Sequence, residues 1–325
     1  MRKTIDTIKD LYDCLHADEN EFFSREEFAE IASAIFYAFG YVRVFYSEIE
    51  FLEYIFQNKL DYNKIIVYNF ARDGQVNGKK SLIPAFCDLL NIRYTGSNAF
   101  VISLLRNKNV YTPILDINNI SVPKSMVIKR KDDYNKLMEI FNRRKIIAKN
   151  THESASIGLT TQNVFDVSDN LPIKLSELFS QMNCAELLVQ EYIDGAEFEV
   201  LVIQFHGIYY SLMPIELVFP DNLTYIDTKM SNSYQYEFKI PSTEVITSLR
   251  EAAKKAASLL NIKDYARFDF RVKNGIPYLF DIAGTPYTIH HSSVAYLFTQ
   301  YYNLPYESIY KVIIACMLSN YDLNN

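Results

Sequence analysis

Near the carboxyl end of the chain, two short alternating runs carry an arginine and two aspartates whose spacing can support chemistry on a phosphate. The runs meet at an Asn-Gly pair over 274–275, which predicts a β-hairpin with Arg267 and Asp269 on one strand and Asp281 on the other. Two converging carboxylates beside an arginine can hold Mg²⁺ on the phosphates of a nucleotide. A sheet surface crossed by salt bridges is the alternative interpretation of the same three residues.

The register of this hairpin decides between the two interpretations. A two-residue loop would pair Asp269 with Phe280, whereas a three-residue loop over 273–275 would pair Arg267 with Asp281. Only the three-residue loop brings the arginine and both aspartates to one face. In that register the other face is aromatic and carries Phe268, Phe270, Tyr278 and Phe280.

Helical and strand patterns alternate around this hairpin along the 325 residues, which indicates an α/β (α+β) architecture. We expect three units: an N-terminal α/β unit over 1–95, a central unit over 96–183, and a sheet-rich C-terminal unit over 184–325.

In the N-terminal unit, the spacing of apolar residues predicts a helix over 24–39, with Ser24 as its N-cap and Gly40 at its end. Its expected buried face is Phe28, Ile31, Ile35, Phe36 and Phe39. Runs at 42–46 and 65–69 predict strands of a small parallel sheet.

The other two units contain further helices and strands. We expect a helix over 97–105 and another that Thr112 caps and Pro113 begins. A helix over 243–261 carries one apolar stripe after Ser242 as its cap. Strands are predicted over 125–128, 145–149, 187–192, 198–204 and 208–215.

Composition excludes several classes of protein. Nine glycines in 325 residues are fewer than half the average usage of about 7%, and neither GxGxxG nor GxxxxGK[ST] occurs. A net charge of −6 argues against nucleic acid as a partner. No apolar run suits a membrane span, and the four separate cysteines are typical of free thiols in a reducing compartment, so we expect a cytoplasmic protein.

Eight short segments, in this order, resemble motifs of the ATP-grasp superfamily and, within it, of the D-alanine:D-alanine ligases. They are 94–97 (YTGS), 105–108 (LRNK), 146–149 (IIAK) with the loop 151–158 (THESASIG), 189–197 (VQEYIDGAE), 227–229 (DTK), 267–269 (RFD), 281–286 (DIAGTP) and 290–292 (HHS). The resemblance covers nearly the whole chain and implies a three-unit fold in which the central and C-terminal units clamp ATP.

The resemblance also implies roles for individual residues. For ATP, these are Lys108, Lys149, Ser156 and Lys229 at the phosphates, Gln190, Glu191, Tyr192 and Ile193 at the adenine, and Glu197 at the ribose. For Mg²⁺, they are Asp269 and Asp281. For catalysis, Arg267 stabilises an oxyanion and Lys229 reaches the γ-phosphate, while Glu21 receives the first substrate's amino group and Ser292 the second substrate's carboxylate.

The activity implied is carboxylate-amine ligation through an acyl phosphate, with ATP and Mg²⁺ as cofactors. The expected partners are two small molecules, a carboxylate and an amine that are both amino acids, and a homodimer is implied by the family alone. Neither substrate can be named from the sequence.

Four departures from the family pattern affect the metal and substrate regions. Ala283 stands where the family has a second-metal asparagine, and Ser154 stands where it has a glycine in the phosphate loop. Met230 replaces a mobile-loop tyrosine, and Tyr287-Thr288 replaces Gly-Met after the last proline. These changes favour a relative with an atypical substrate, while a true D-alanine:D-alanine ligase and an impaired nucleotide-binding pseudoenzyme stay open.

Overall fold

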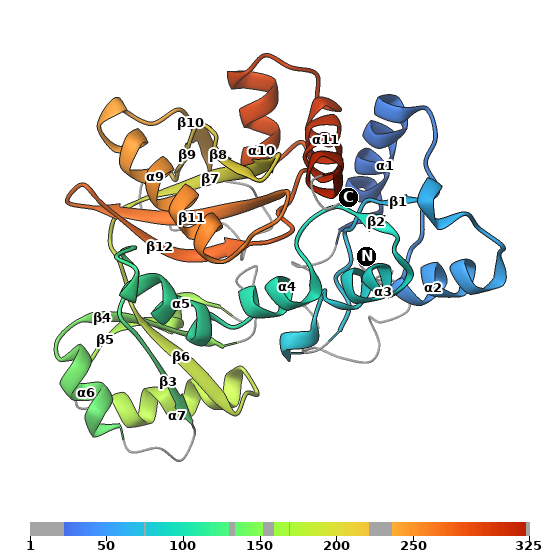
Figure 1. Ribbon diagram of the computed structural model, residues 1–325. Helices are drawn as coiled ribbons and strands as arrows, with labels where there is room; N and C mark the ends of the chain where they lie inside the picture. The colour runs from blue at the N-terminus through green and yellow to red at the C-terminus, as the bar shows by residue number, and fades with distance from the viewer. Residues whose placement is uncertain are drawn as a thin grey trace.

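The protein is described by a computed structural model over residues 23–74, 76–129, 134–151, 159–168, 170–220 and 236–322. Figure 1 shows an N-terminal body on one side and two larger sheets on the other, stacked one above the other, with α4 (Ala99–Leu105) and α5 (Lys108–Ile117) between them. No helix of these described ranges is long and apolar enough to cross a membrane.

Helix α1 (Arg25–Phe39) confirms the first predicted helix and both of its ends. The Ser24 hydroxyl accepts a hydrogen bond from the Glu27 N–H, while the Glu27 carboxylate accepts one from the Ser24 N–H. This reciprocal cap satisfies two N–H groups that a helix otherwise leaves open. Gly40, at φ 76°, ends the helix in the left-handed conformation that glycine adopts most easily.

The prediction for the rest of the N-terminal body is partly wrong. On α1, Phe36 and Phe39 are 50% and 46% exposed, and Ile31 and Ala34 are buried. Residues 42–46 form no strand, and Phe45 packs against rings of α2 (Glu48–Gln57).

Among the described residues of this body, the parallel sheet is one pair of short strands. It consists of β1 (Ile66–Val67) and β2 (Arg93–Tyr94), with α3 (Leu82–Leu90) between them in the chain.

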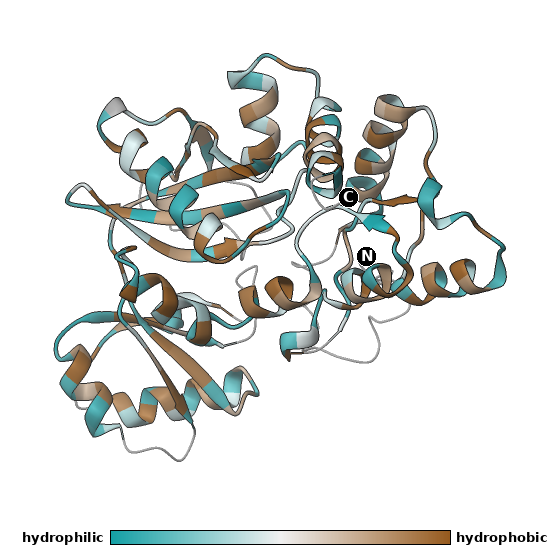
Figure 2. Ribbon diagram, viewed as in Figure 1, coloured by the Kyte–Doolittle hydropathy of each residue, from teal (hydrophilic) through white to brown (hydrophobic). Residues whose placement is uncertain are grey.

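The central sheet is antiparallel, in the order β3-β6-β4-β5. Its elements are β3 (Ser125–Lys129), β4 (Lys145–Asn150), β5 (Val164–Asp166) and β6 (Glu186–Glu191), with helices α6 (Asn135–Phe141) and α7 (Leu171–Gln181). Both helices share one core with the sheet, and Figure 2 shows brown apolar stretches along β3, β6 and α7.

The predicted unit boundaries stay predictions, but one strand after the second boundary pairs with strands before it. β6 follows the 183/184 boundary, yet it pairs with β3 and β4 in the central sheet.

One helix start differs from its prediction. Thr112 and Pro113 lie inside α5, which begins at Lys108. Pro113 has no N–H to donate to the carbonyl of Asn109, four residues earlier, but the helix continues through it.

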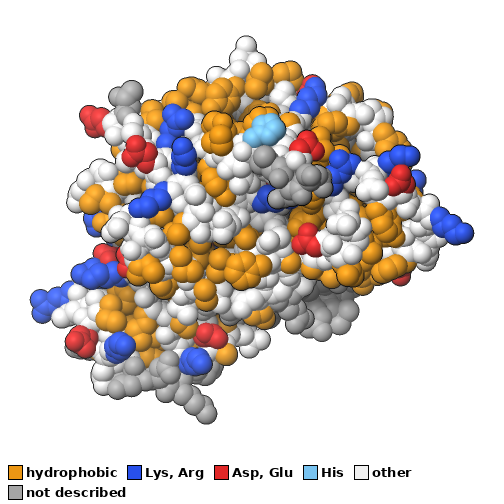
Figure 3. All heavy atoms as spheres, in the orientation of Figure 1, with side chains coloured by type: hydrophobic (Ala, Val, Ile, Leu, Met, Phe, Trp, Pro, Cys, Tyr) orange, Lys and Arg blue, Asp and Glu red, His pale blue; other side chains and the backbone are white. Residues whose placement is uncertain are grey.

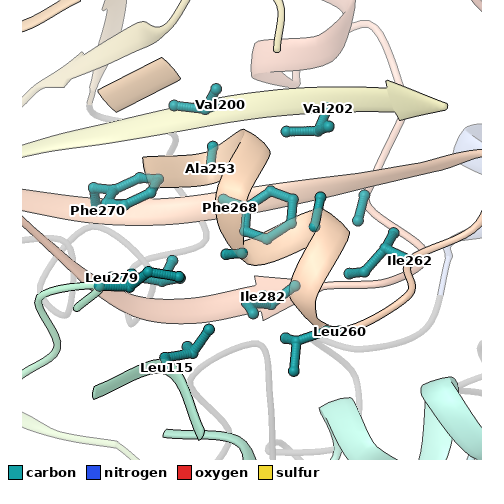
Figure 4. Packing of buried hydrophobic residues seen from close by; sticks show 14 of the residues in the cluster. Leu115, Val200, Val202, Ala253, Leu260, Ile262, Phe268, Phe270, Leu279 and Ile282 are labelled. Carbon is teal, nitrogen blue, oxygen red and sulfur yellow. The ribbon is translucent and has the colours of Figure 1, made fainter. Parts of the chain in front are cut away.

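The C-terminal sheet has the order β10-β9-β7-β11-β12, and β8 pairs with β7. Its strands are β7 (Ala196–Phe205), β8 (Ile208–Ser211), β9 (Ile215–Val218), β10 (Glu237–Lys239), β11 (Tyr265–Lys273) and β12 (Ile276–Ala283). Helix α9 (Thr243–Leu259) covers one face, and its Ala253 lies beside Phe268 and Phe270 in Figure 4. The chain then continues through α10 (Ser293–Tyr296), a π-helical turn (Leu297–Tyr301) and α11 (Ser308–Asp322), and α11 packs on α1.

The hairpin β11–β12 adopts neither of the two expected registers. Its loop has two residues, and Lys273 faces Ile276, but a bulge shifts the pairing so that Asp269 faces Asp281. The bulge also changes which side chains of β12 face the core. Leu279 and Ile282 are buried there, whereas Tyr278 and Phe280, expected on that face, are half-buried.

We expect the substitution Gly195→Ala to lower the free energy of unfolding by about 2 to 3 kcal/mol. A Cβ at this position would lie 2.1 Å from the carbonyl oxygen of Val272, on a strand that is paired on both sides and cannot move away. Urea unfolding measures the effect. Gly78→Ala is the matched control because its Cβ would meet nothing within 4 Å. Equal unfolding midpoints for the two variants would contradict the expectation.

Candidate active site

The two hairpin carboxylates lie opposite each other and are held by different cations. Asp269 and Asp281 are Cα partners across β11 and β12. Arg267 binds Asp269 through two hydrogen bonds, Nε to Oδ1 and Nη2 to Oδ2, both 2.8 Å. The same guanidinium lies 3.1 Å from Oε1 of Glu199, which pairs with Asp269 from β7 on the other side. Arg267 therefore joins two buried carboxylates.

Lys108, the first residue of α5, holds the second carboxylate. Its Nζ lies 2.7 Å from Oδ1 of Asp281, and the lysine is 4% exposed. This contact joins the start of a helix that follows the N-terminal body to the last strand of the C-terminal sheet.

The pKa values of the two aspartates are driven apart. Burial, together with Glu199 and Asp281, raises the pKa of Asp269 to about 7, although Arg267 opposes this shift. Burial acts in the same direction on Asp281, but Lys108 and Lys149 outweigh it and lower the pKa of Asp281 to about 2. Asp281 is therefore ionised at neutral pH.

Lys149 approaches the same carboxylate from the central sheet. Its Nζ donates a hydrogen bond of 2.8 Å to Oε1 of Gln190, on the neighbouring strand β6. Burial and the positive charges of Lys108 and Arg271 lower the pKa of Lys149 to about 7, while Asp281 raises it. Since these charges act on one another, the two sheets bring Lys149, Lys108 and Asp281 into one electrostatic environment.

The segment between β6 and β7 is held by an arginine of β11. Arg271 binds Oε2 of Glu197 through Nη2 at 3.1 Å and the carbonyl oxygen of Ile193 through Nη1 at 3.1 Å. Its guanidinium carbon also lies 4.6 Å from the centre of the Tyr192 ring. The nearby Glu191 binds Arg144 at 2.9 Å.

Two of these residues, Arg271 and Glu199, were missed from the sequence. Strict alternation along β11 would have indicated Arg271 on the face of Arg267 and Asp269. Alternation along β7 would equally have placed Glu199 with Glu197.

Burial separates this cluster from a salt-bridged sheet surface. Asp269, Glu199 and Glu197 are between 5% and 8% exposed. In Figure 3, by contrast, charged side chains on the lobe of the central sheet protrude at the surface. Because buried charges cost free energy unless they are paired, the cluster is typical of a functional site.

The remaining residues that the sequence predicts are partly outside this cluster. Glu21, Ser156 and Lys229 lie outside the described residues. Ser292 is buried, and its hydroxyl donates to the carbonyl oxygen of Ile289 at 2.6 Å and accepts from the Ala295 N–H.

The donors present fit a magnesium ion that is also bound to phosphate. Among the described residues, no cluster of three or more His, Cys, Asp or Glu side chains can hold a metal ion. Mg²⁺, however, commonly takes one or two protein carboxylates and completes its shell with water and phosphate oxygens. Asp269 and Asp281, facing each other, supply that set.

Comparisons with known proteins agree on one family. A family model described as D-ala D-ala ligase C-terminus matches residues 114–315. The D-alanine–D-alanine ligase of Flavobacterium psychrophilum is 26% identical over 222 residues, which are 64% of this chain and 63% of the relative. The ligase of Maridesulfovibrio salexigens is 26% identical over 214 residues, 64% of this chain and 67% of the relative. The chain thus spans less than two thirds of the length of the Flavobacterium relative.

Solved structures support the same fold. The D-alanine–D-alanine ligase from Bacillus anthracis has a TM-score of 0.67 at 18% identity, covering 94% of this chain and 97% of that one. A structure of that ligase complexed with ATP has a TM-score of 0.56 at 19% identity, with 73% of each chain covered.

Proposed function

Because the chain belongs to the D-ala D-ala ligase C-terminus family, we propose that it is an ATP-dependent ligase that joins a carboxylate to an amine. The observation that carries the proposal is the pairing of Asp269 with Asp281, with Lys108 on one of these carboxylates and Arg267 on the other. This arrangement offers both anionic oxygens for a metal ion and cations for phosphate, as transfer of a phosphoryl group requires.

The roles at ATP follow from the positions of the cations. We assign Lys108 and Lys149 to the phosphates, because both ammonium groups act on Asp281, Lys108 from α5 and Lys149 from β4. The segment 190–193 holds the adenine and Glu197 the ribose hydroxyls. Arg271 binds Oε2 of Glu197, so Oε1 of Glu197 can accept a hydrogen bond from a ribose hydroxyl.

The chemistry that these residues support has two steps. In the first, an oxygen of the substrate carboxylate attacks the γ-phosphorus of ATP, and the bond to ADP breaks. In the second, the amine attacks the activated carbonyl carbon, loses a proton, and phosphate leaves. Asp269 and Asp281 would hold Mg²⁺, which would neutralise charge on the phosphates. Arg267 binds the oxyanion that develops on the carbonyl oxygen in the second step.

We propose that the substrates differ from two D-alanines. Ala283 offers no oxygen at the position where the resemblance implies a metal ligand. The ring of Tyr287, four residues later, packs edge-on against Phe23 with 5.2 Å between the ring centroids, at a position where the resemblance implies a glycine. Both changes lie on the segment that follows Asp281.

A panel of amino acids tests this function. The protein is incubated with Mg-ATP and pairs of D- and L-amino acids, and phosphate release is measured together with product masses. We expect phosphate release that requires both a carboxylate and an amine, and a product that is not D-alanyl-D-alanine. No release with any pair, despite a rise in Tm with Mg-ATP, would favour a nucleotide-binding pseudoenzyme. In that case Ala283→Asn is the informative variant, because a gain in turnover would indicate an impaired metal site.

Nucleotide affinity should fall as the pH rises above about 7. Phosphates favour the charged form of Lys149, so binding raises its pKa from about 7 and takes up a proton. Above that pH Lys149 of the free protein is mostly neutral, so nucleotide binding must take a proton from solvent. Affinity then falls by up to about tenfold per pH unit.

Calorimetry at about pH 8, in two buffers with different ionisation enthalpies, measures this proton uptake directly. Uptake should disappear in Lys149→Met and persist in Lys174→Met, a half-buried lysine of α7. Equal binding enthalpies of the wild type in both buffers would contradict the expected coupling.

A further inference from the structure

Arg72, in the loop after β1, is a buried cation enclosed by aromatic rings. It is 2% exposed, and its guanidinium carbon lies 5.2 Å from the centre of the Phe23 ring and 5.4 Å from that of Tyr287. Its Nη1 donates to Thr285 Oγ1 at 2.6 Å, and its Nη2 donates to the carbonyl oxygen of Thr285 at 2.9 Å. Both of these partners are neutral.

Within the described chain, no carboxylate pairs with this guanidinium, and its Nε is buried without a hydrogen-bond partner. A nearby carboxylate, Glu48, accepts hydrogen bonds from the backbone N–H groups of Arg72 and Asp73. Charged side chains are almost never fully buried unless they are paired, because removing a charge from water is costly. The Nε and Nη2 edge keeps the fork geometry that binds a carboxylate through two hydrogen bonds.

The position of Arg72 connects this fork to the proposed site. Thr285 follows Ala283 by two residues, a span of at most about 7 Å along an extended chain, and Ala283 is the Cα partner of Arg267. Arg72 therefore contacts the segment that carries Asp281 and whose strand pairs with the strand of Arg267.

The hydroxyl expected to receive the second substrate's carboxylate is already engaged. Ser292 has one hydroxyl hydrogen, and it is donated to the carbonyl oxygen of Ile289, while its oxygen caps α10. A carboxylate can bind this hydroxyl only if the bond to Ile289 breaks. Arg72 offers unused donors and a full positive charge instead.

We propose that Arg72 binds the carboxylate of the amino acid that supplies the attacking amine. The inference rests on the proposed ligase function, and it specifies the carboxylate of the amine-supplying substrate as a group that this chain recognises. Glu48 fixes the backbone of Arg72, and the two rings exclude water, so the guanidinium is pre-organised for an anion. Because the Tyr287 ring covers the guanidinium, the substrate enters when this ring moves aside.

Competition between an amino acid and its own carboxamide tests the proposal. The protein receives Mg-ATP with an equimolar mixture, D-alanine with D-alaninamide first and then the other amino acids of the panel. Only the free acid can be activated, but both can supply the amine, so mass spectrometry of the dipeptide and the dipeptide amide reports recognition of the acceptor's carboxylate. The product ratio does not depend on how much of the protein is folded.

We expect the wild type to prefer the free acid at least about 100-fold, because a site built to pair with a group rejects the analogue that lacks it. Arg72→Met should reduce this preference to below about tenfold, and Arg72→Lys should lie between, since an ammonium lacks the fork. Thr285→Val is the matched control. It removes the same 2.6 Å hydrogen bond but leaves the charge, and should keep the preference.

The outcomes separate this inference from the function on which it rests. Product formation with equal ratios in wild type and Arg72→Met would show that Arg72 only braces Thr285, and would overturn the inference alone. Loss of preference in Thr285→Val as large as in Arg72→Met would overturn it as well. Absence of any ligation product with the wild type would overturn the proposed function and the inference together.

Discussion

Replacement of Asp281 by asparagine should reduce ATP-dependent turnover by at least about 10³-fold, because metal-assisted stabilisation of phosphoryl charge contributes several kcal/mol. The aspartate is ionised at neutral pH, with a pKa near 2, so the variant removes a full negative charge from the site. Steady-state phosphate release over a range of Mg²⁺ concentrations measures the loss. Turnover within about tenfold of the wild type would contradict the role of Asp281.

A second variant separates this loss of chemistry from a loss of folding. Asp281→Asn leaves the ammonium of Lys108, which is 4% exposed, without its anion, at a cost of about 3 to 5 kcal/mol. Removing both partners in Lys108→Met with Asp281→Asn should restore much of the stability but none of the turnover. Glu237→Gln is the control, because its pair with Lys239 is exposed and should change stability by less than about 1 kcal/mol.

The sequence was informative where a pattern is local. The N-cap at Ser24 and the end of α1 at Gly40 depend on neighbouring residues, and both were predicted correctly. The site residues were found through motifs that each span a few residues. The roles that these motifs imply stay predictions. The fold class and the family were predicted from many such segments in one order, and the match to the family model and the similarity to solved structures confirm them.

What the sequence did not predict depends on contacts between distant segments. The loop of the hairpin has two residues, which alone would pair Asp269 with Phe280. The bulge that brings Asp281 opposite Asp269 accompanies the burial of Leu279 and Ile282 in the core beneath α9. Local loop rules do not include this packing requirement.

Arg72 shows the same limit from the other direction. Nothing in its neighbouring residues marks it, because its rings and hydrogen-bond partners come from Phe23 and from 285–287, more than 200 residues later in the second case. Arg72 was singled out because its guanidinium is buried without a carboxylate partner among the described residues, and only the folded chain shows this.

Replacement of Arg267 by glutamine should lower kcat by about 10² to 10³-fold and also move the pH dependence of the reaction. In the free protein, burial raises the pKa of Asp269 to about 7, and Arg267 limits this rise. Without the guanidinium the pKa rises further, so the carboxylate that is needed for the metal ion ionises only at higher pH. The acid limb of kcat/KM, which reports the free enzyme, should therefore move upward by at least about one pH unit.

The pH shift is the readout that a merely structural arginine would not produce. Arg250→Gln is the matched control, because Arg250 lies on α9 and donates to the carbonyl oxygen of Ser211, away from the carboxylates. It should leave both kcat and the acid limb unchanged. If Arg267→Gln lowered kcat but kept the acid limb of the wild type, Arg267 would act on the oxyanion alone. A pKa shift is expected because Arg267 is the cation bound to both oxygens of Asp269. Without such a shift, the pKa of Asp269 would be set by its other neighbours.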